Sequence, residues 1–203
     1  MIAGAWPVRW SVAWAMAMTL LLGGLQACSS IPRIVVLHDP LTSEEHVTLG
    51  TSYEGQGFKE MAAREYQAAL HQRSDFAPAL IGLGNLSFES GAFQEAEDYY
   101  RRALDADPHH PGAGNNLAMV YLSRGERLDE AERLVGNALE QAGPLRPYVL
   151  DTLARIYTRT GRYREAKAIL AEAEAAAPSE NKSLHERLAQ SKQELGAVDF
   201  RTP

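Results

Sequence analysis

The amino-acid sequence predicts an all-α fold, a solenoid of about four helix-turn-helix units closed by one further helix. Three observations lead to this prediction. A motif returns about every 34 residues, a glycine follows each run of about fourteen residues of helical pattern, and alanines recur in the middle of the helix that comes next. The chain has 203 residues, of which 45% are hydrophobic, so it can bury a core.

The charge balance argues against a nucleic-acid partner. The formal net charge is −6, and Arg9 is the only charged side chain before Cys28, so the chain from Cys28 onward holds 19 basic and 26 acidic residues, a net charge of −7. Phosphate binding needs a concentrated basic patch, whereas the Lys and Arg residues here are scattered among Asp and Glu. We therefore expect no nucleic-acid partner.

Residues 1–27 have the layout of a secretory signal peptide. Residues 10–25 carry no charge, and they follow a short segment whose positive charges are the terminal amine and Arg9. A charged start, an apolar middle and small residues at the exit distinguish such a signal from a spanning helix with polar flanks at both ends. An uncleaved membrane anchor is the alternative, because about sixteen apolar residues can nearly cross a bilayer.

The end of this segment, "LQAC", resembles the lipobox of bacterial lipoproteins. Leu25 stands three residues before the cysteine and Ala27 is the small residue at the cut, while Gln26 is a less usual middle residue. The resemblance implies that Cys28 becomes the first residue of the mature protein and carries acyl chains such as palmitate on its sulfur and nitrogen. One acyl chain gives only reversible attachment, whereas two or three hold a protein on the bilayer.

The residue after Cys28 helps to predict whether the lipoprotein stays at the inner membrane or reaches the outer membrane. In such lipoproteins an aspartate there is associated with retention at the inner membrane, so Ser29 favours the outer membrane of a Gram-negative cell, with the protein facing the periplasm. The alternative for Cys28 is an incidental free thiol; as the only cysteine, it cannot form an intrachain disulfide.

Residues 28–42 are expected to be a linker between the lipidated cysteine and the first helix. Pro32 and Pro40 oppose helix, and the apolar run at residues 34–37 lies between them and can dock in an extended conformation. Thr42 and Glu45 then have the spacing of a capping box, which predicts a helix start.

From there the chain repeats itself. The first half of each unit carries a Leu followed by a small residue, usually a Tyr, and then a Gly that ends the helix in the left-handed conformation. The four copies are Leu49-Gly50, Tyr53 and Gly57; Leu83-Gly84, Ser87 and Gly91; Leu117-Ala118, Tyr121 and Gly125; and Leu153-Ala154, Tyr157 and Gly161.

The second half of each unit carries two alanines around a larger residue. Small residues at this place let two helix axes approach closely. The copies are Ala62, Tyr66 and Ala69; Ala96, Tyr100 and Ala103; Ala131, Val135 and Ala138; and Ala166, Leu170 and Ala173, with Pro108 and Pro178 stopping the second and fourth of these helices.

This pattern resembles the tetratricopeptide repeat, a helix-turn-helix unit of 34 residues, and the resemblance implies a right-handed α-solenoid. It covers residues 43–180, divided into units 43–76, 77–110, 111–145 and 147–180. The third unit departs most from the pattern, because Gly114 replaces a large residue and both of its turns are one residue longer.

A capping helix is expected at residues 181–195, followed by a flexible tail at 196–203. Leu184, Leu188 and Leu195 fall on one side of this helix and charges on the other. A stack of repeats leaves its last apolar face open, and a helix with a polar outer side closes it.

The sequence offers no constellation for catalysis, and we expect no enzyme, no cofactor and no metal site. The adjacent His109 and His110 have no third ligand nearby and are expected in a solvated turn. His46 is likewise expected at the surface, and the pairs Glu97-Asp98 and Arg101-Arg102 on solvated helix faces.

The resemblance also implies that the first helices line a concave groove. The positions between the core residues would point into it, with asparagines able to hold a peptide backbone and larger side chains offering apolar pockets. Ordinary surface or packing polarity is the alternative for these residues. They are Asn85, Phe88, Asn115, Asn116, Met119, Leu122, Tyr148, Asp151, Arg155 and Arg159.

These observations favour a membrane-anchored scaffold or adaptor that binds a protein or peptide in the groove. By analogy with outer-membrane lipoproteins built from such repeats, assembly of pili or secretins is the expected setting. The alternative is an accessory subunit of an envelope protease or a cell-wall hydrolase.

Overall fold

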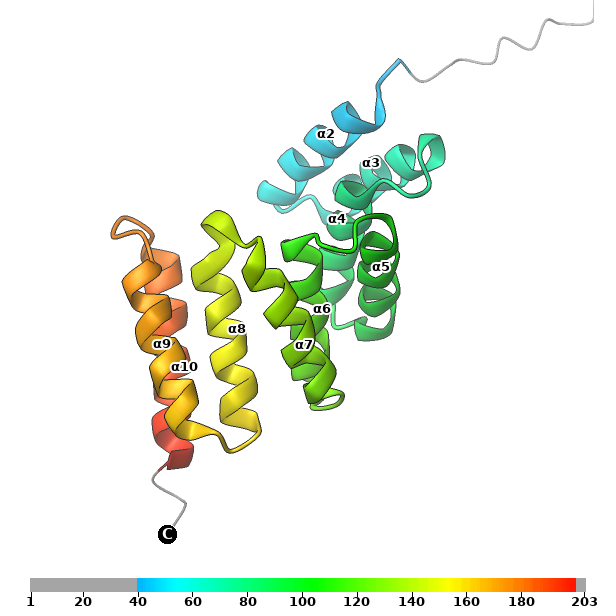
Figure 1. Ribbon diagram of the computed structural model, residues 1–203. Helices are drawn as coiled ribbons and strands as arrows, with labels where there is room; N and C mark the ends of the chain where they lie inside the picture. The colour runs from blue at the N-terminus through cyan, green and yellow to red at the C-terminus, as the bar shows by residue number, and fades with distance from the viewer. Residues whose placement is uncertain (1–39, 200–203) are drawn as a thin grey trace, which may run out of the picture. The chain divides into compact units, whose positions relative to one another are not determined.

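The computed structural model describes residues 40–199, and within this range the chain is helical with no strand (Figure 1). The predictions for Cys28, for the signal peptide and for residues 34–37 concern positions outside the described residues. The helices are α2 (Ser43–Gly55), α3 (Lys59–Gln72), α4 (Ala77–Glu89), α5 (Phe93–Ala106), α6 (Pro111–Arg124), α7 (Leu128–Glu140), the 3-10 turn η1 (Gly143–Leu145), α8 (Arg146–Arg159), α9 (Tyr163–Ala176) and α10 (Lys182–Asp199).

Consecutive helices form four antiparallel pairs, α2/α3, α4/α5, α6/α7 and α8/α9, which follow one another as Figure 1 shows. Each second helix packs on the first helix of the next pair, and the first helices α2, α4, α6 and α8 also contact one another in series. The first helices therefore share one side of the stack. This arrangement confirms the predicted solenoid.

The start of the first helix and the turns within the four pairs have the expected local chemistry. The Thr42 hydroxyl accepts a hydrogen bond from the Glu45 backbone N–H at 3.2 Å, and the Glu45 carboxylate accepts one from the Thr42 N–H at 2.7 Å, which confirms the capping box. The turn glycines of the four pairs take positive φ angles between 69° and 82°, as left-handed helix ends require.

The last helix closes the stack and is longer than predicted. Helix α10 packs against α9 and α8, and Leu184, Leu188 and Leu195 are buried in that contact. The helix continues to Asp199, so the expected flexible tail from residue 196 is wrong for its first four residues. Residues 196–199 contain no proline, so every residue of this stretch keeps the backbone N–H that a helix needs.

Two tyrosines of the second helices fit into the stack only because glycines face them. A Cβ atom on Gly82 would lie 2.5 Å from the Tyr66 ring and one on Gly50 would lie 2.7 Å from it, while a Cβ on Gly84 would lie 2.5 Å from the ring of Tyr100. The Tyr66 ring therefore occupies the space between α2 and α4, and the helices approach each other across it.

Replacing Gly82 by alanine should therefore destabilise the protein although alanine is the better helix former. Overpacking costs about 1–3 kcal/mol, and the gain in helix propensity is about 1 kcal/mol. Because the new Cβ would lie only 2.5 Å from the ring, we expect the upper part of this range, a net loss of up to about 2 kcal/mol in the free energy of unfolding. The matched control is Gly136→Ala in α7, where nothing lies within 4 Å of the new Cβ and a gain is expected. Urea denaturation of both variants measures their free energies of unfolding. Changes of the same sign in the two variants would contradict the proposed clash with Tyr66.

Candidate functional site

Three adjoining hollows follow the side of the stack formed by the first helices, and together we call them the groove. The N-terminal hollow lies between α2 and α4 and measures about 520 Å³, the central hollow about 190 Å³ and the C-terminal hollow about 340 Å³. Glu54 and Asn85 line both the N-terminal and the central hollow, and Asn116 and Arg187 line both the central and the C-terminal hollow. The hollows therefore form one continuous path.

Most of the predicted partner-binding residues lie along this path. Asn85, Phe88, Asn116 and Met119 line the central hollow, and Asn115, Asn116 and Tyr148 line the C-terminal hollow. The structure thus brings six of the ten predicted groove residues together.

The two predicted arginines do not line any of the three hollows. Arg155 lies beside the groove, where its Nη1 atom is 3.8 Å from the Met119 sulfur and its Nε is 3.8 Å from the Glu194 carboxylate. Arg159 lies at the turn of the third pair, since a Cβ on Gly125 would be 2.8 Å from its Nη2 atom. Its position at the end of α8 takes it away from the groove.

Two further residues that the pattern placed in the groove are buried. Leu122 is 3% exposed and belongs to the core of the third pair. Asp151 is fully buried, and its two carboxylate oxygens accept hydrogen bonds from Arg187 Nε and from the Ser191 hydroxyl, each at 2.6 Å. Asp151 therefore holds α10 against α8, which the sequence pattern of α8 alone does not show.

Arg187 is the groove residue that the sequence analysis missed. It comes from α10, lines two of the hollows and has a side chain 35% exposed. The sequence does contain an indication of this position. Arg187 and Ser191 follow Leu184 at spacings of three and seven residues, so they lie on the side of α10 that packs on the stack.

The asparagines of the groove bind one another. Asn85 Oδ1 accepts hydrogen bonds from the Tyr100 hydroxyl at 2.8 Å and from Asn116 Nδ2 at 2.9 Å, and Asn116 Oδ1 accepts one from Asn115 Nδ2 at 3.3 Å. Burial raises the pKa of the Tyr100 hydroxyl, so it is a donor at neutral pH. The oxygen of Asn85 is thus occupied, and what it can offer a peptide is its Nδ2 donor group.

A carboxylate lies where the N-terminal and the central hollow meet. Glu54 accepts a hydrogen bond of 2.6 Å from the Tyr66 hydroxyl, and burial together with this bond raises the pKa of Tyr66 to about 12. Apolar side chains of the N-terminal hollow, among them Val47 and Ile81, lie near it. The groove therefore carries an acidic group at α2 and a basic group at α10.

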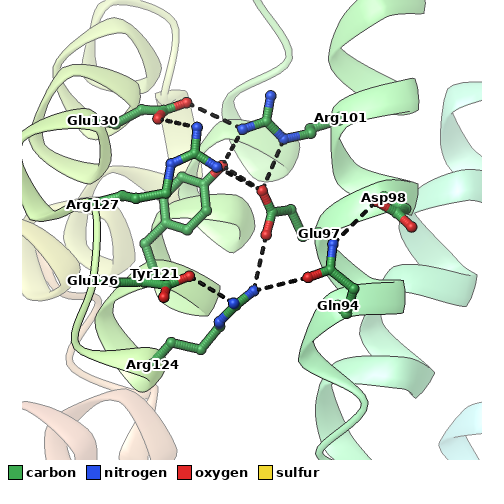
Figure 2. Close-up of polar contacts among 9 residues, drawn as sticks. All are labelled: Gln94, Glu97, Asp98, Arg101, Tyr121, Arg124, Glu126, Arg127 and Glu130. Atoms are coloured by element: carbon green, nitrogen blue, oxygen red, sulfur yellow. Dashed lines mark hydrogen bonds and ion pairs between the residues drawn. The ribbon is translucent and has the colours of Figure 1, made fainter.

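A second polar cluster, centred on Glu97, contradicts the expectation of a solvated helix face (Figure 2). Glu97 is 6% exposed, and its carboxylate pairs with Arg101 at 3.0 Å, Arg124 at 3.0 Å and Arg127 at 2.8 Å. The Tyr121 hydroxyl donates to it at 3.1 Å. Three guanidinium groups, from α5, from the end of α6 and from the turn that follows it, therefore converge on one carboxylate.

The ionisation of Glu97 follows from these contacts. Burial by itself raises the pKa of the carboxyl group, but hydrogen bonds from Arg101 and Tyr121 and the charges of Arg101 and Arg127 outweigh it, so the pKa is lowered. Glu97 is ionised at neutral pH and joins the second pair of helices to the third.

The same contact recurs at the next interface. Arg162, in the turn between α8 and α9, pairs with Glu132 of α7 at 2.8 Å, and its guanidinium lies 3.8 Å from the Tyr157 ring centroid. Arg127 lies over the Tyr121 ring in the same way, at 4.7 Å. Both ion pairs span 30 residues, so they form a ladder along the array.

Two histidines, His46 and His110, take structural positions. His46 is 3% exposed and hydrogen-bonds to the Glu65 carboxylate at 2.8 Å, so its expected surface position is wrong. His110 Nδ1 accepts the Ala113 N–H at 3.2 Å and caps α6. Residues 40–199 contain no group of three or more His, Cys, Asp or Glu side chains that could hold a metal.

The part of the chain that the structure describes also contains no helix long and apolar enough to cross a membrane.

Three family models, each described as "Tetratricopeptide repeat", match residues 47–111, 87–149 and 148–173. Two curated relatives are each 31% identical. Cellulose synthase operon protein C of Pseudomonas fluorescens matches over 49% of this chain and 8% of its own length, and Photosystem I assembly protein Ycf3 of Rippkaea orientalis over 45% and 58%. The chain thus spans less than two thirds of either relative.

Among solved structures, this chain is similar to PilW, described as a widely conserved type IV pilus biogenesis factor. The TM-score is 0.66, the identity is 20%, and the match covers 76% of this chain and 70% of PilW. At this identity the similarity shows the fold.

Proposed function

Because this chain belongs to the tetratricopeptide repeat family, a scaffold suited to protein–protein interaction, we propose that it is a lipid-anchored adaptor of the bacterial outer membrane that faces the periplasm and holds a protein or peptide partner in its groove. It acts by binding and not by catalysis.

The continuous groove is the observation that carries this proposal. Its hollows share lining residues from the first helix to the last, and they combine apolar side chains such as Phe88 and Met119 with amide and charged groups. An extended segment recognised by a few apolar anchors and polar contacts suits such a surface.

The cellular machinery in which the protein acts is proposed by analogy. PilW, which shares the fold, is described as a pilus biogenesis factor, and this supports a search among pilus and secretin components. An envelope protease or a cell-wall hydrolase that copurifies in place of these would favour the role of an accessory subunit.

The lipid anchor predicts that Cys28→Ala abolishes membrane attachment through acyl chains. Without the thiol no acyl chain can be added, so the precursor should keep residues 1–27 and migrate more slowly in electrophoresis. Labelling of cells with radioactive palmitate should mark the wild-type protein and not the variant. The control is Ser30→Ala, which should be labelled normally. Equal labelling of Cys28→Ala would contradict the anchor.

The groove predicts that Asn116→Ala combined with Met119→Ala weakens partner capture by about tenfold or more, because a few central contacts carry most of a binding energy. Capture is measured by affinity purification from detergent-solubilised membranes followed by mass spectrometry, and the far-UV circular dichroism should be unchanged.

The matched control for this pair is Arg164→Ala combined with Lys167→Ala, two exposed residues of α9 that line none of the three hollows. Capture that is lost in the control and kept in the groove variant would place the partner elsewhere.

A further inference from the structure

We propose that the groove selects a partner segment with an aspartate or glutamate in its interior, flanked by apolar residues, and that Arg187 of the capping helix binds this side-chain carboxylate. The inference rests on the proposed function, since it specifies the chemistry of the segment that the groove holds.

Arg187 is presented to the groove in a fixed orientation. Its Nε atom donates to Asp151, which is fully buried and is held in turn by Ser191, so the guanidinium plane is set by a carboxylate behind it. Among the described residues, the Nη2 atom of Arg187 has a weak polar contact with the Met119 sulfur at 3.5 Å. The outer edge of the guanidinium is therefore available for a bidentate contact with a second carboxylate.

The surroundings of Arg187 favour an anion. Among the described residues that line the C-terminal hollow, Arg187 is the only charged one. Arg155 also contacts the Met119 sulfur, at 3.8 Å, so two guanidinium groups approach one atom at the junction with the central hollow. In the central hollow Arg187 shares the lining with two acidic residues, Glu89, which pairs with Lys59 at 2.7 Å, and Glu54, which accepts a hydrogen bond from the Tyr66 hydroxyl. A carboxylate is therefore favoured on the side of Arg187 that faces the C-terminal hollow.

A buried acceptor beside Arg187 indicates that the ligand also brings a donor. Asn115 is 9% exposed and lines the C-terminal hollow, and its Oδ1 atom has no hydrogen-bond partner among the described residues. A buried oxygen without a partner costs about 1–3 kcal/mol. A backbone N–H of an extended segment would satisfy it.

The position of Arg187 favours a side chain over a chain terminus. Arg187 lines the central and the C-terminal hollow, so a carboxylate bound to it has space on both sides. A segment that ended there would leave one hollow empty. A segment that continues would place apolar residues against Phe88 and Met119 on one side and against Leu145, which is 40% exposed, on the other.

The test compares three short peptides by calorimetry with the full chain in detergent. The first is acetyl-Ala-Leu-Glu-Ala-Leu-Ala-amide, whose glutamate is its only charge. The second has Gln in place of Glu, and the third is the Gln peptide with a free C-terminal carboxylate. We expect the Glu peptide to bind at least about tenfold more tightly than either of the others, as a charge-assisted hydrogen bond provides.

The matched variant is Asp151→Asn combined with Arg187→Gln, which removes the cation without leaving a buried charge unpaired. We expect the Glu and Gln peptides to bind it equally. Arg164→Gln changes an exposed arginine of α9 and should keep the wild-type ratio between the affinities for the Glu and the Gln peptide. If the double variant does not fold, Arg187→Lys serves instead, because it keeps a cation for Asp151 but lacks the planar fork, and the ratio should fall at least about threefold.

Equal binding of the Glu and Gln peptides by the wild-type protein would overturn the inference. Tighter binding of the peptide with the free terminus would overturn it too, in favour of a site for a chain end. These measurements do not involve the native partner, whereas capture by the Asn116 and Met119 variant does, so each proposal fails separately.

Discussion

Asp151→Ala should unfold the C-terminal end of the array and lower the free energy of unfolding by about 3 kcal/mol. Removing one member of a buried ion pair costs about 3–5 kcal/mol, and the lower end applies because Arg187 is 35% exposed and can be solvated. The variant also leaves Ser191 without its acceptor. Helix α10 should lose its fixed contact with α8, and the amide groups of Lys182–Asp199 should exchange faster with solvent.

Hydrogen exchange and urea denaturation measure both effects. The control is Glu194→Ala on the same helix, whose carboxylate is 46% exposed and 3.8 Å from Arg155. We expect a change below about 0.5 kcal/mol there, as for exposed ion pairs. A loss in Asp151→Ala no greater than in the control would show that the pair does not hold α10.

Glu97→Gln should be the other strongly destabilising substitution, with a loss of about 2 kcal/mol. It leaves three arginines facing each other around a neutral group, and their exposure, 29–42%, reduces the cost below that of a fully buried pair. Glu126→Gln is the matched control, because Glu126 is 43% exposed and pairs with Arg124 alone. If the two substitutions lowered the free energy of unfolding equally, the convergence of three arginines on Glu97 would add nothing to stability.

The contribution of Glu97 to the free energy of unfolding should also depend on pH. Its pKa is lower in the folded than in the unfolded protein, so its contribution is fully present above the ordinary carboxyl value of about 4.3 and is lost as the pH falls through the folded value. The difference in stability between wild type and Glu97→Gln should therefore be constant near pH 7 and shrink below about pH 4. A difference that grows on acidification would contradict the lowered pKa.

The fold could be predicted from the sequence because its determinants are local and repeated. The turn glycines, the alanines of the second helices and the 34-residue spacing each report on contacts within one unit or with the next, and four copies of them are present. The capping helix could be predicted from Leu184, Leu188 and Leu195 for the same reason.

The missed parts of the site depend on contacts between distant residues. Asp151 and Arg187 are 36 residues apart, and the burial of one and the exposure of the other are set by how α10 docks. Glu97 looks like any acidic residue on a helix surface. It is buried by Arg124 at the end of α6 and by Arg127 in the turn that follows, which lie 27 and 30 residues later in the chain. A helical wheel cannot show such neighbours.

The Glu–Arg ladder has a mechanical consequence. Ala63 stands in the first unit where Glu97 and Glu132 stand in the next two, so the first interface is crossed instead by the exposed pair of Lys59 and Glu89. Stability in such arrays is a sum of nearest-neighbour terms, and an exposed pair adds little. Under a pull from the proposed membrane anchor, the hairpin α2/α3 would therefore depend on apolar packing, such as that of the Tyr66 ring between α2 and α4, and not on the partly buried ion pairs that join the later hairpins.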